Sequence, residues 1–345
     1  MKNRIRIAFG AALAPLFLAG VALGQTAGFV DPRAPIADPG CADLKLVSTG
    51  GKFPADPSTL AVRWTGYSNF ELAYKGQILL LDAYFDRGST FMPLGFKAVD
   101  VGKTNAILIG HGHVDHMSDA ASIAIRTGTP IVGAPVSTDK LRAQNVPDSL
   151  LKTVTGKDTK GEAMTFGAFS ITPVLGRHGE PPAAITAPFN AALNSTTPPY
   201  TPAEQSELDA ISARGTSDAR VTAEGTIAYI IKLDNGFTIM YRDSGGVVTA
   251  EEKAAMATQK NVDLALVAVS AAFLNDDTAA RAVEHVDAYH PAIYWPAHND
   301  AGRRGLWRAT EPLFQAVKDK YPNIVGISRT YRQPACFDTR IQQAR

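Results

Sequence analysis

The stretch His111-Gly112-His113-Val114-Asp115-His116 places three imidazoles and one carboxylate within six residues. The residues just before it, Ala106 to Ile109, are apolar and indicate a short buried strand that runs directly into this cluster. Imidazole nitrogen and carboxylate oxygen suit a borderline-soft divalent ion, and a loop lets neighbouring side chains face two metals. The stretch therefore predicts a metal site at a strand end. The alternative, a cluster of surface histidines without a metal, does not explain this spacing.

The sequence on either side of the cluster predicts an α/β protein. Asp234-Asn235-Gly236 is a strong hairpin signal, and Gly128 is typical of a helix end. Strands that alternate with helices after early hairpins indicate two mixed sheets, packed face to face and covered outside by helices. We expect strands at residues 60–64, 70–74, 78–82, 106–109, 130–133, 169–175, 226–233, 237–241, 264–269 and 292–296, and helices at 118–126, 250–258 and 277–289.

The motif H-x-H-x-D-H is complete here, and with it the chain resembles the metallo-β-lactamase superfamily. That family has, in chain order, an Asp that closes an early strand, a lone His, a bridging Asp and a final His, each at a strand end. Asp82, His178, Asp243 and His298 occupy these places. The resemblance covers roughly Leu60 to Ile327 and implies a four-layer αββα sandwich.

The resemblance also implies a dinuclear metal centre. We expect two divalent ions, zinc in the first place, with iron or manganese as alternatives. A shared hydroxide would attack an ester, lactone or phosphodiester, and Asp115 would orient or accept the proton. Asp82 would orient a ligand from behind, unless it is only a turn carboxylate or a helix cap. One ion would be held by His111, His113 and His178, the other by Asp115, His116 and His298, with Asp243 as the bridge.

Within the superfamily, two segments are similar to the branch of the ascorbate-phosphate lactonase-like and N-acyl-phosphatidylethanolamine phospholipase D-like proteins. These segments are Trp-Thr-Gly-Tyr-Ser-Asn-Phe at 64–70 and Pro-Ala-His at 296–298. Two departures argue against a β-lactamase or a glyoxalase II. Arg242 stands before the bridging Asp where the family often has Gly, and His178 lies in Arg-His-Gly-Glu instead of Gly-His-Thr.

The N-terminal residues predict export to the periplasm or the medium. Lys2, Arg4 and Arg6 precede an apolar run that ends at Ala22-Leu23-Gly24, as in a cleaved secretory signal peptide. We expect a signal peptide at 1–24, an extended leader at 25–57, and one domain at 58–345. An insertion at 180–224, rich in Pro, Ser, Thr and Ala, fits neither periodicity and is expected to form a lid or substrate wall.

After export the chain keeps only Cys41 and Cys336, one near each end. They could form a disulfide in an oxidising compartment, or remain two thiols that never meet, because the sequence does not give their separation.

Composition limits the partners. The formal net charge is +1 and the Lys and Arg residues are spread thinly, so a nucleic-acid partner is not expected. We expect a small-molecule substrate and no membrane contact beyond the signal peptide; the sequence does not determine the oligomeric state. Two alternatives to a hydrolase remain open: a mononuclear iron oxidoreductase on the same scaffold, and a secreted metal-binding protein without catalysis.

Several residues near the predicted ligands have two interpretations. Arg242, Arg303 and Arg304 would either contact substrate or, as strand alternation and loop position favour, point elsewhere. The hairpin residues 67–69 would likewise either contact substrate or have no contact with it. His285, in an amphipathic helix, is expected to face solvent or to pack the helix, and His290 to lie at the far end of a strand from the metals.

Overall fold

The computed structural model describes residues 31, 33–180, 199–259, 261–269, 276–300 and 309–342. Pro32–Arg345 form one compact unit of the chain, separate from Met1–Asp31. The expected signal peptide lies outside the described residues. In the part of the chain that is described, no helix combines the length and the apolar character needed to cross a membrane.

Two seven-stranded sheets form the centre of the larger unit. Each has an antiparallel half and a parallel half: strands β14 to β3 and β7 to β10 pair antiparallel, and the remaining neighbours pair parallel. In spatial order the first sheet consists of β14 (Pro334–Asp338), β1 (Thr59–Trp64), β2 (Phe70–Tyr74), β3 (Gln77–Leu81), β4 (Ala106–Leu108), β5 (Ile131–Gly133) and β6 (Leu151–Thr153). The second consists of β13 (Val325–Gly326), β12 (Pro291–Ala297), β11 (Val262–Ala268), β10 (Thr238–Arg242), β9 (Ile227–Leu233), β8 (Phe169–Leu175) and β7 (Met164–Phe166).

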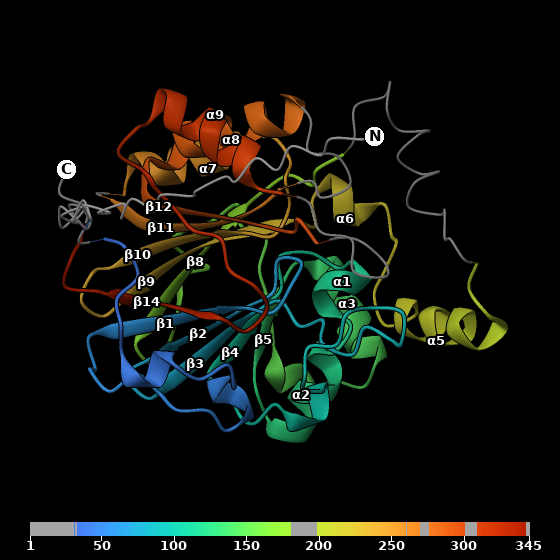
Figure 1. Ribbon diagram of the computed structural model, residues 1–345. Coiled ribbons are helices and arrows are strands. Elements are labelled where there is room, and N and C mark those ends of the chain that lie inside the picture. The colour runs from blue at the N-terminus through green and yellow to red at the C-terminus, as the bar shows by residue number, and fades with distance from the viewer. Residues whose placement is uncertain are drawn as a thin grey trace, which may run out of the picture. The chain divides into compact units, whose positions relative to one another are not determined.

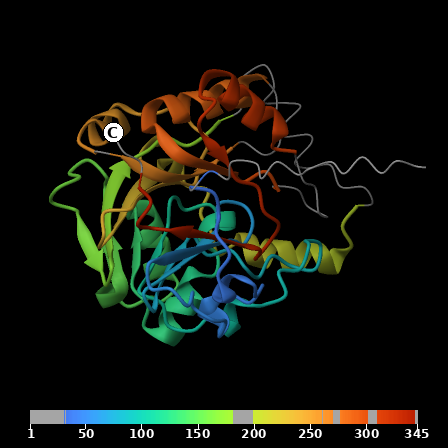
Figure 2. The ribbon, with the colours of Figure 1, turned by 60° about the vertical axis from the view of Figure 1, so that its left-hand side comes forward.

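Helices cover the outer face of each sheet (Figures 1 and 2). Those of the first sheet are α1 (Val114–Met117), α2 (Ala120–Thr127) and α3 (Pro135–Ala143). Those of the second are α7 (Ala250–Ala257), α8 (Asp276–Tyr289) and α9 (Glu311–Lys320). The largest apolar cluster lies between the sheets, where Phe70 meets Trp295 edge to face at 5.4 Å between ring centroids. The prediction of an αββα sandwich is confirmed.

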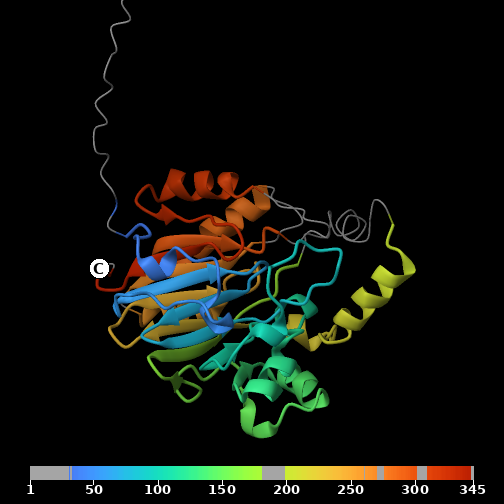
Figure 3. The same ribbon diagram turned by 60° about the horizontal axis from the view of Figure 1, so that its bottom comes forward.

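The described part of the insertion is more regular than the sequence indicated. It contains two helices, α5 (Pro202–Ser212) and α6 (Arg220–Ala223), so the expectation of a segment without periodicity is wrong there. A capping box of Thr201 and Glu204 begins α5. Only Leu208 and Ile211 of α5 are buried, and Figure 3 shows this helix standing away from the sandwich, which explains its weak apolar pattern. Residues 181–198 lie outside the described residues.

The described part of the expected leader packs on the domain and includes two short 3-10 helices, η1 (Pro39–Cys41) and η2 (Val47–Thr49). The backbone N–H groups of Val47 and Ser48 each donate to the buried carboxylate of Glu71 at 2.8 Å. Cys41 and Cys336 form a disulfide with a Cα–Cα distance of 6.3 Å. The leader is therefore fastened to both β2 and β14.

The remaining differences concern short elements. We did not expect α1, α3, α9, η3 (Ala98–Asp100), η4 (Asp148–Leu150), β6, β7, β13 or β14. Most of these have nine or fewer residues, and in so short a window neither periodicity stands out from its neighbours.

Candidate metal centre

The predicted ligands follow four strands drawn from both sheets. His111 to His116 follow β4, His178 follows β8, Asp243 follows β10, and His298 follows β12. Gly110 allows the close approach of the two sheets here, because a Cβ at this position would lie 2.0 Å from the Asp243 carboxyl carbon. The structure brings all the predicted ligands into three overlapping groups: His111, His113 and His178; His111, His116 and Asp243; and Asp115, His116 and His298.

The distances between donor atoms fit a metal ion. His111 Nε2 lies 3.0 Å from His113 Nδ1, and the His178 ring centroid is within 4.9 Å of both their rings. On the other side, Asp115 Oδ2 lies 3.5 Å from His116 Nε2 and 3.2 Å from His298 Nε2. Ligands at about 2.0 Å from a tetrahedral zinc ion are separated by roughly 3.3 Å.

Asp243 lies between the two groups. Its Oδ2 is 2.5 Å from His111 Nδ1 and 3.3 Å from His116 Nδ1. Its Oδ1 is buried and has no hydrogen-bond partner in the described part of the chain, and the same holds for the Nδ1 atoms of His178 and His298. Buried polar atoms without partners are costly, so these side chains fit a centre that a cation would complete.

The pKa shifts favour neutral imidazoles in the group of His111, His113 and His178, and an ionised carboxylate at Asp115 in the other group. Burial lowers the pKa of His111 and His113, and it lowers the pKa of His178 to about 2. Metal-binding histidine must be neutral, so these imidazoles are in the required form. Burial alone would raise the pKa of Asp115, but His116 and His298 beside it hold that pKa well below its usual range.

A different balance applies to His116, Asp243 and Asp82. Burial alone would lower the pKa of His116, but Asp115, Asp82 and Asp243 raise it overall. Burial raises the pKa of Asp82 to about 7 and that of Asp243 to about 6. The centre thus concentrates carboxyl groups in a buried place, where a bound cation would stabilise their ionised form.

Asp82 contacts the ligand set from behind. Its Oδ2 lies 2.7 Å from His116 Nδ1, and its Oδ1 accepts a hydrogen bond from Gly110 N at 2.9 Å. This contact leaves His116 Nε2 on the side of Asp115 and His298. Asp82 has φ 58°, a strained value of the kind that clusters at functional sites.

Replacing Asp82 tests whether it orients His116. We expect Asp82→Asn to weaken zinc binding by about 10- to 100-fold, because a supporting carboxylate is lost while Asn still tolerates positive φ. Zinc affinity would be measured by competition with a chromogenic chelator, with the exposed Asp139→Asn as the control. An unchanged affinity would leave Asp82 the role of a turn carboxylate.

Ser68, Asn69 and Arg242 contact the predicted ligands or residues next to them. Ser68 Oγ donates to Asp243 O at 2.7 Å, and Asn69 Nδ2 donates to Asp115 O at 3.1 Å, so this buried hairpin supports ligand backbone. Arg242 is fully buried and points away toward Glu252, as strand alternation favours. Sequence reasoning missed the support role of the hairpin, which only contacts across the fold reveal.

His285 and His290 do not belong to the centre. His285 is buried against Gly246 O at 2.9 Å, so of its two expected environments helix packing is right and solvent is wrong. His290 is exposed and immediately precedes β12, whereas His298 follows that strand. Arg303 and Arg304 lie outside the described residues.

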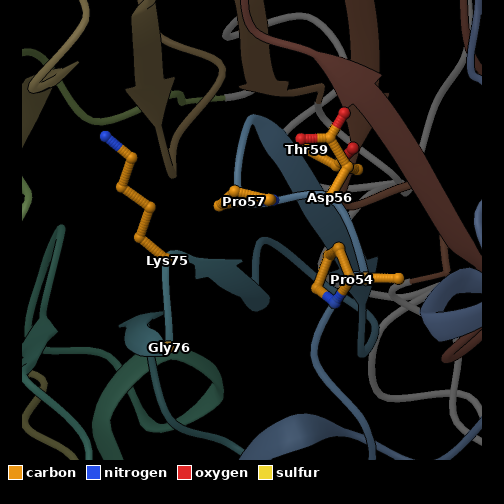
Figure 4. Close-up of a pocket in the computed structure, with 7 residues that line it drawn as sticks. Pro54, Asp56, Pro57, Thr59, Lys75 and Gly76 are labelled. Carbon is orange, nitrogen blue, oxygen red and sulfur yellow. The ribbon is translucent and has the colours of Figure 1, made fainter.

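A surface cavity of about 270 Å³ is lined by residues between Pro54 and Gly76 (Figure 4). Its lining includes Asp56, Thr59 and Lys75 but none of the predicted metal ligands. Lys75 Nζ lies 2.7 Å from Asp234 and is therefore neutralised within the chain. This cavity offers no chemistry comparable to that of the metal centre.

Comparison with known proteins finds a superfamily domain and relatives described as metal-dependent hydrolases. Residues 77–200 match the family model described as a beta-lactamase superfamily domain. A "UPF0173 metal-dependent hydrolase" of Cereibacter sphaeroides is 26% identical over 136 residues, which are 39% of this chain and 56% of that protein. The chain thus matches little more than half the length of this relative. Another of the same description, from Cupriavidus metallidurans, is 24% identical over 277 residues, 79% of this chain and 81% of that one.

Two solved structures share the fold. Igni18, a metallo hydrolase from Ignicoccus hospitalis, aligns with a TM-score of 0.55 at 14% identity, over 81% of this chain and 98% of that one. CmlA, a diiron β-hydroxylase from Streptomyces venezuelae, aligns with a TM-score of 0.50 at 13% identity, over 82% and 55%. At these identities the likeness shows the fold alone. Residues 77–200 therefore match a beta-lactamase superfamily domain, within a chain that shares its fold with a solved metallo hydrolase.

Proposed function

We propose that the protein is an exported, metal-dependent hydrolase that acts on an ester, lactone or phosphodiester. The observation that carries this proposal is the convergence of His and Asp side chains from four strand ends into adjoining three-ligand groups. A structural zinc site is normally closed by four protein ligands, whereas a catalytic site keeps a position for water or substrate. His111, His113 and His178 would hold one ion, Asp115, His116 and His298 the other, and Asp243 would bridge them.

Access to the centre supports catalysis over a purely structural site. The Asp115 and His298 side chains keep 23% and 18% of their surface exposed, whereas Asp82 and Asp243 are fully buried. When bound, a metal pair would lower the pKa of a water molecule and polarise the oxygen of the scissile bond. Asp115 is the partly exposed carboxylate of the set, so it would orient or accept the proton.

The segment after His178 contributes a wall beside this opening. Thr216 N donates to Gly112 O at 2.8 Å, and Ile211 of α5 packs with Tyr67, Tyr84 and the partly buried Val114. The described part of the 180–224 segment therefore touches the metal motif itself, which supports its role as a substrate wall. We place the specificity of the enzyme there, with a small molecule as the substrate.

Metal content and hydrolysis test the proposal together. We expect elemental mass spectrometry of the purified protein to find about two zinc ions per chain, as in dinuclear sites. A panel of chromogenic lactone, ester, phosphodiester and β-lactam substrates should show turnover that a chelator removes and zinc restores. One iron without hydrolysis would favour the oxidoreductase, and two metals without turnover would favour the non-catalytic alternative.

Export is part of the same proposal. The Cys41–Cys336 disulfide supports it, because disulfides persist in oxidising compartments such as the periplasm. N-terminal sequencing of the protein recovered from periplasm or medium should begin at Gln25. An intact Met1 on protein recovered from the cytoplasm would argue against export.

A further inference from the structure

We propose that each half of the metal centre is positioned by its own buried arginine: Arg87 for the half that contains His298, and Arg242 for the half that contains His178. The inference rests on the two ligand groups of the proposed function but not on the reaction. Both arginines are almost completely buried, at 4% and 0% exposure, and each is paired with a buried carboxylate. A buried ion pair often adds no net stability, because the cost of removing both charges from water offsets their attraction. The role of each arginine is therefore inferred from its other contacts.

Arg87 is connected to His298 through a short chain of contacts. Its guanidinium lies 3.6 Å from Asp300 Oδ2, and it donates to the backbone oxygens of Thr65 and Tyr84. It also lies over the rings of Tyr67, Tyr84 and Tyr331, at 5.2 to 5.3 Å from their centroids. Such a caged cation is held in one geometry.

Asp300 transmits this fixed position to the ligand. Its Oδ1 accepts from Tyr67 N at 2.7 Å, and Tyr67 O in turn accepts from His298 N at 2.8 Å. The Tyr67 ring also packs edge-on against the His298 imidazole at 5.0 Å. Tyr67 and His298 have φ of 49° and 65°, so their backbone needs support from such contacts. Arg87 and Asp300 therefore hold His298 against Asp115.

Arg242 fastens the two loops that carry His178 and Asp243. It donates to Arg177 O at 3.0 Å and to Val247 O at 2.8 Å, and also to Gly246 O. Its Nε lies 3.0 Å from Glu252 Oε1 in α7. One rigid guanidinium thus contacts the residue before His178 and the loop after Asp243.

The loop that carries His178 and the loop that follows Asp243 also pack directly against each other. A Cβ at Gly246 would lie 2.2 Å from Arg177 O and 2.6 Å from His178 O, so the two loops touch directly. Gly179 N also donates to Ser244 Oγ at 2.8 Å. Since His178 Nδ1 has no hydrogen-bond partner among the described residues, its place depends on its backbone and on the metal. Arg242 therefore positions His178 by binding the backbone of both loops, at Arg177 and at Val247.

The test isolates each half of the centre. His178→Ala leaves the Asp115, His116 and His298 group intact, and His298→Ala leaves the His111, His113 and His178 group intact. Zinc affinity of each background would be measured by competition with a chromogenic chelator, alone and with Asp300→Asn or Glu252→Gln. These conservative changes weaken one arginine pair without removing a buried guanidinium.

We expect Asp300→Asn to weaken zinc binding by about 10- to 100-fold in the His178→Ala background and to leave it unchanged in the His298→Ala background. Glu252→Gln should give the reverse pattern. Arg142→Met, which removes an exposed pair with Asp148, is the matched control. Arg87→Met and Arg242→Met should reproduce the two patterns with larger losses.

The outcomes separate this inference from the proposed function. A lower melting temperature with unchanged zinc affinity would overturn the positioning role, and so would equal losses in both backgrounds. If the unmodified protein bound no zinc at all, the metal centre itself would be wrong. The crossed pattern would support the inference even if no substrate had been found.

Discussion

Asp115→Asn should lower the turnover of any hydrolysed substrate by about 10²- to 10⁴-fold, the usual contribution of a positioned proton acceptor. Asp115 Oδ2 lies within 3.5 Å of both His116 Nε2 and His298 Nε2, and the Asp115 side chain keeps 23% of its surface exposed, so water can reach it. The amide of Asn has similar size but cannot accept the proton. The fold should therefore persist while turnover is lost.

Three measurements on this variant separate a loss of turnover from a loss of metal or of the fold: the initial rate at saturating substrate, the metal content and the melting temperature. Asp243→Ala should lose metal as well as turnover, because its carboxylate lies between the two ligand groups. The exposed Asp139→Asn is the control for a lost carboxylate elsewhere. Full turnover of Asp115→Asn on a proven substrate would show that Asp115 does not handle the proton.

Removal of the disulfide should have the largest effect on stability. Cys41 and Cys336 are 295 residues apart in sequence, and closing so long a loop reduces the entropy of the unfolded chain. We expect Cys41→Ser to lower the free energy of unfolding by on the order of 5 kcal/mol. Cys41 is the better position to replace, because Cys336 is 1% exposed and a hydroxyl there would add a buried polar group.

Denaturant unfolding with and without a reductant measures this effect. Reduced wild-type protein should unfold at the same midpoint as Cys41→Ser, and the reductant should not change the variant further. If Cys41→Ser and the oxidised wild type had the same midpoint, the cross-link would contribute nothing to stability. In that case the leader would be held by its other contacts, such as those of Val47 and Ser48 with Glu71.

Much of the fold and the candidate site could be predicted because the signals were local. The H-x-H-x-D-H motif follows a strand whose apolar run is visible in a short window, and strand alternation already favoured Arg242 pointing away from Asp243. The resemblance then supplied His178, Asp243 and His298 in chain order. The structure brings these side chains together with the motif.

What could not be predicted depends on contacts between distant residues. The α5 helix has a local start signal, the Thr201 and Glu204 capping box, but only a narrow apolar stripe. The sequence leaves two environments open for His285, because the pattern of one helix face does not show what packs against it. Its burial follows from the loop at Gly246, 39 residues away.

By itself, therefore, the sequence determined the sandwich and the strand ends that bear the candidate ligands, and it predicts a divalent metal there. The tertiary structure alone decided that Cys41 meets Cys336, that Tyr67 supports His298 through Asp300, and that Arg242 joins two loops. The physical reason is one of range. Periodicity and ligand chemistry are properties of neighbouring residues, whereas the pairing of Tyr67 with Asp300 across 233 residues exists only once both sheets have packed.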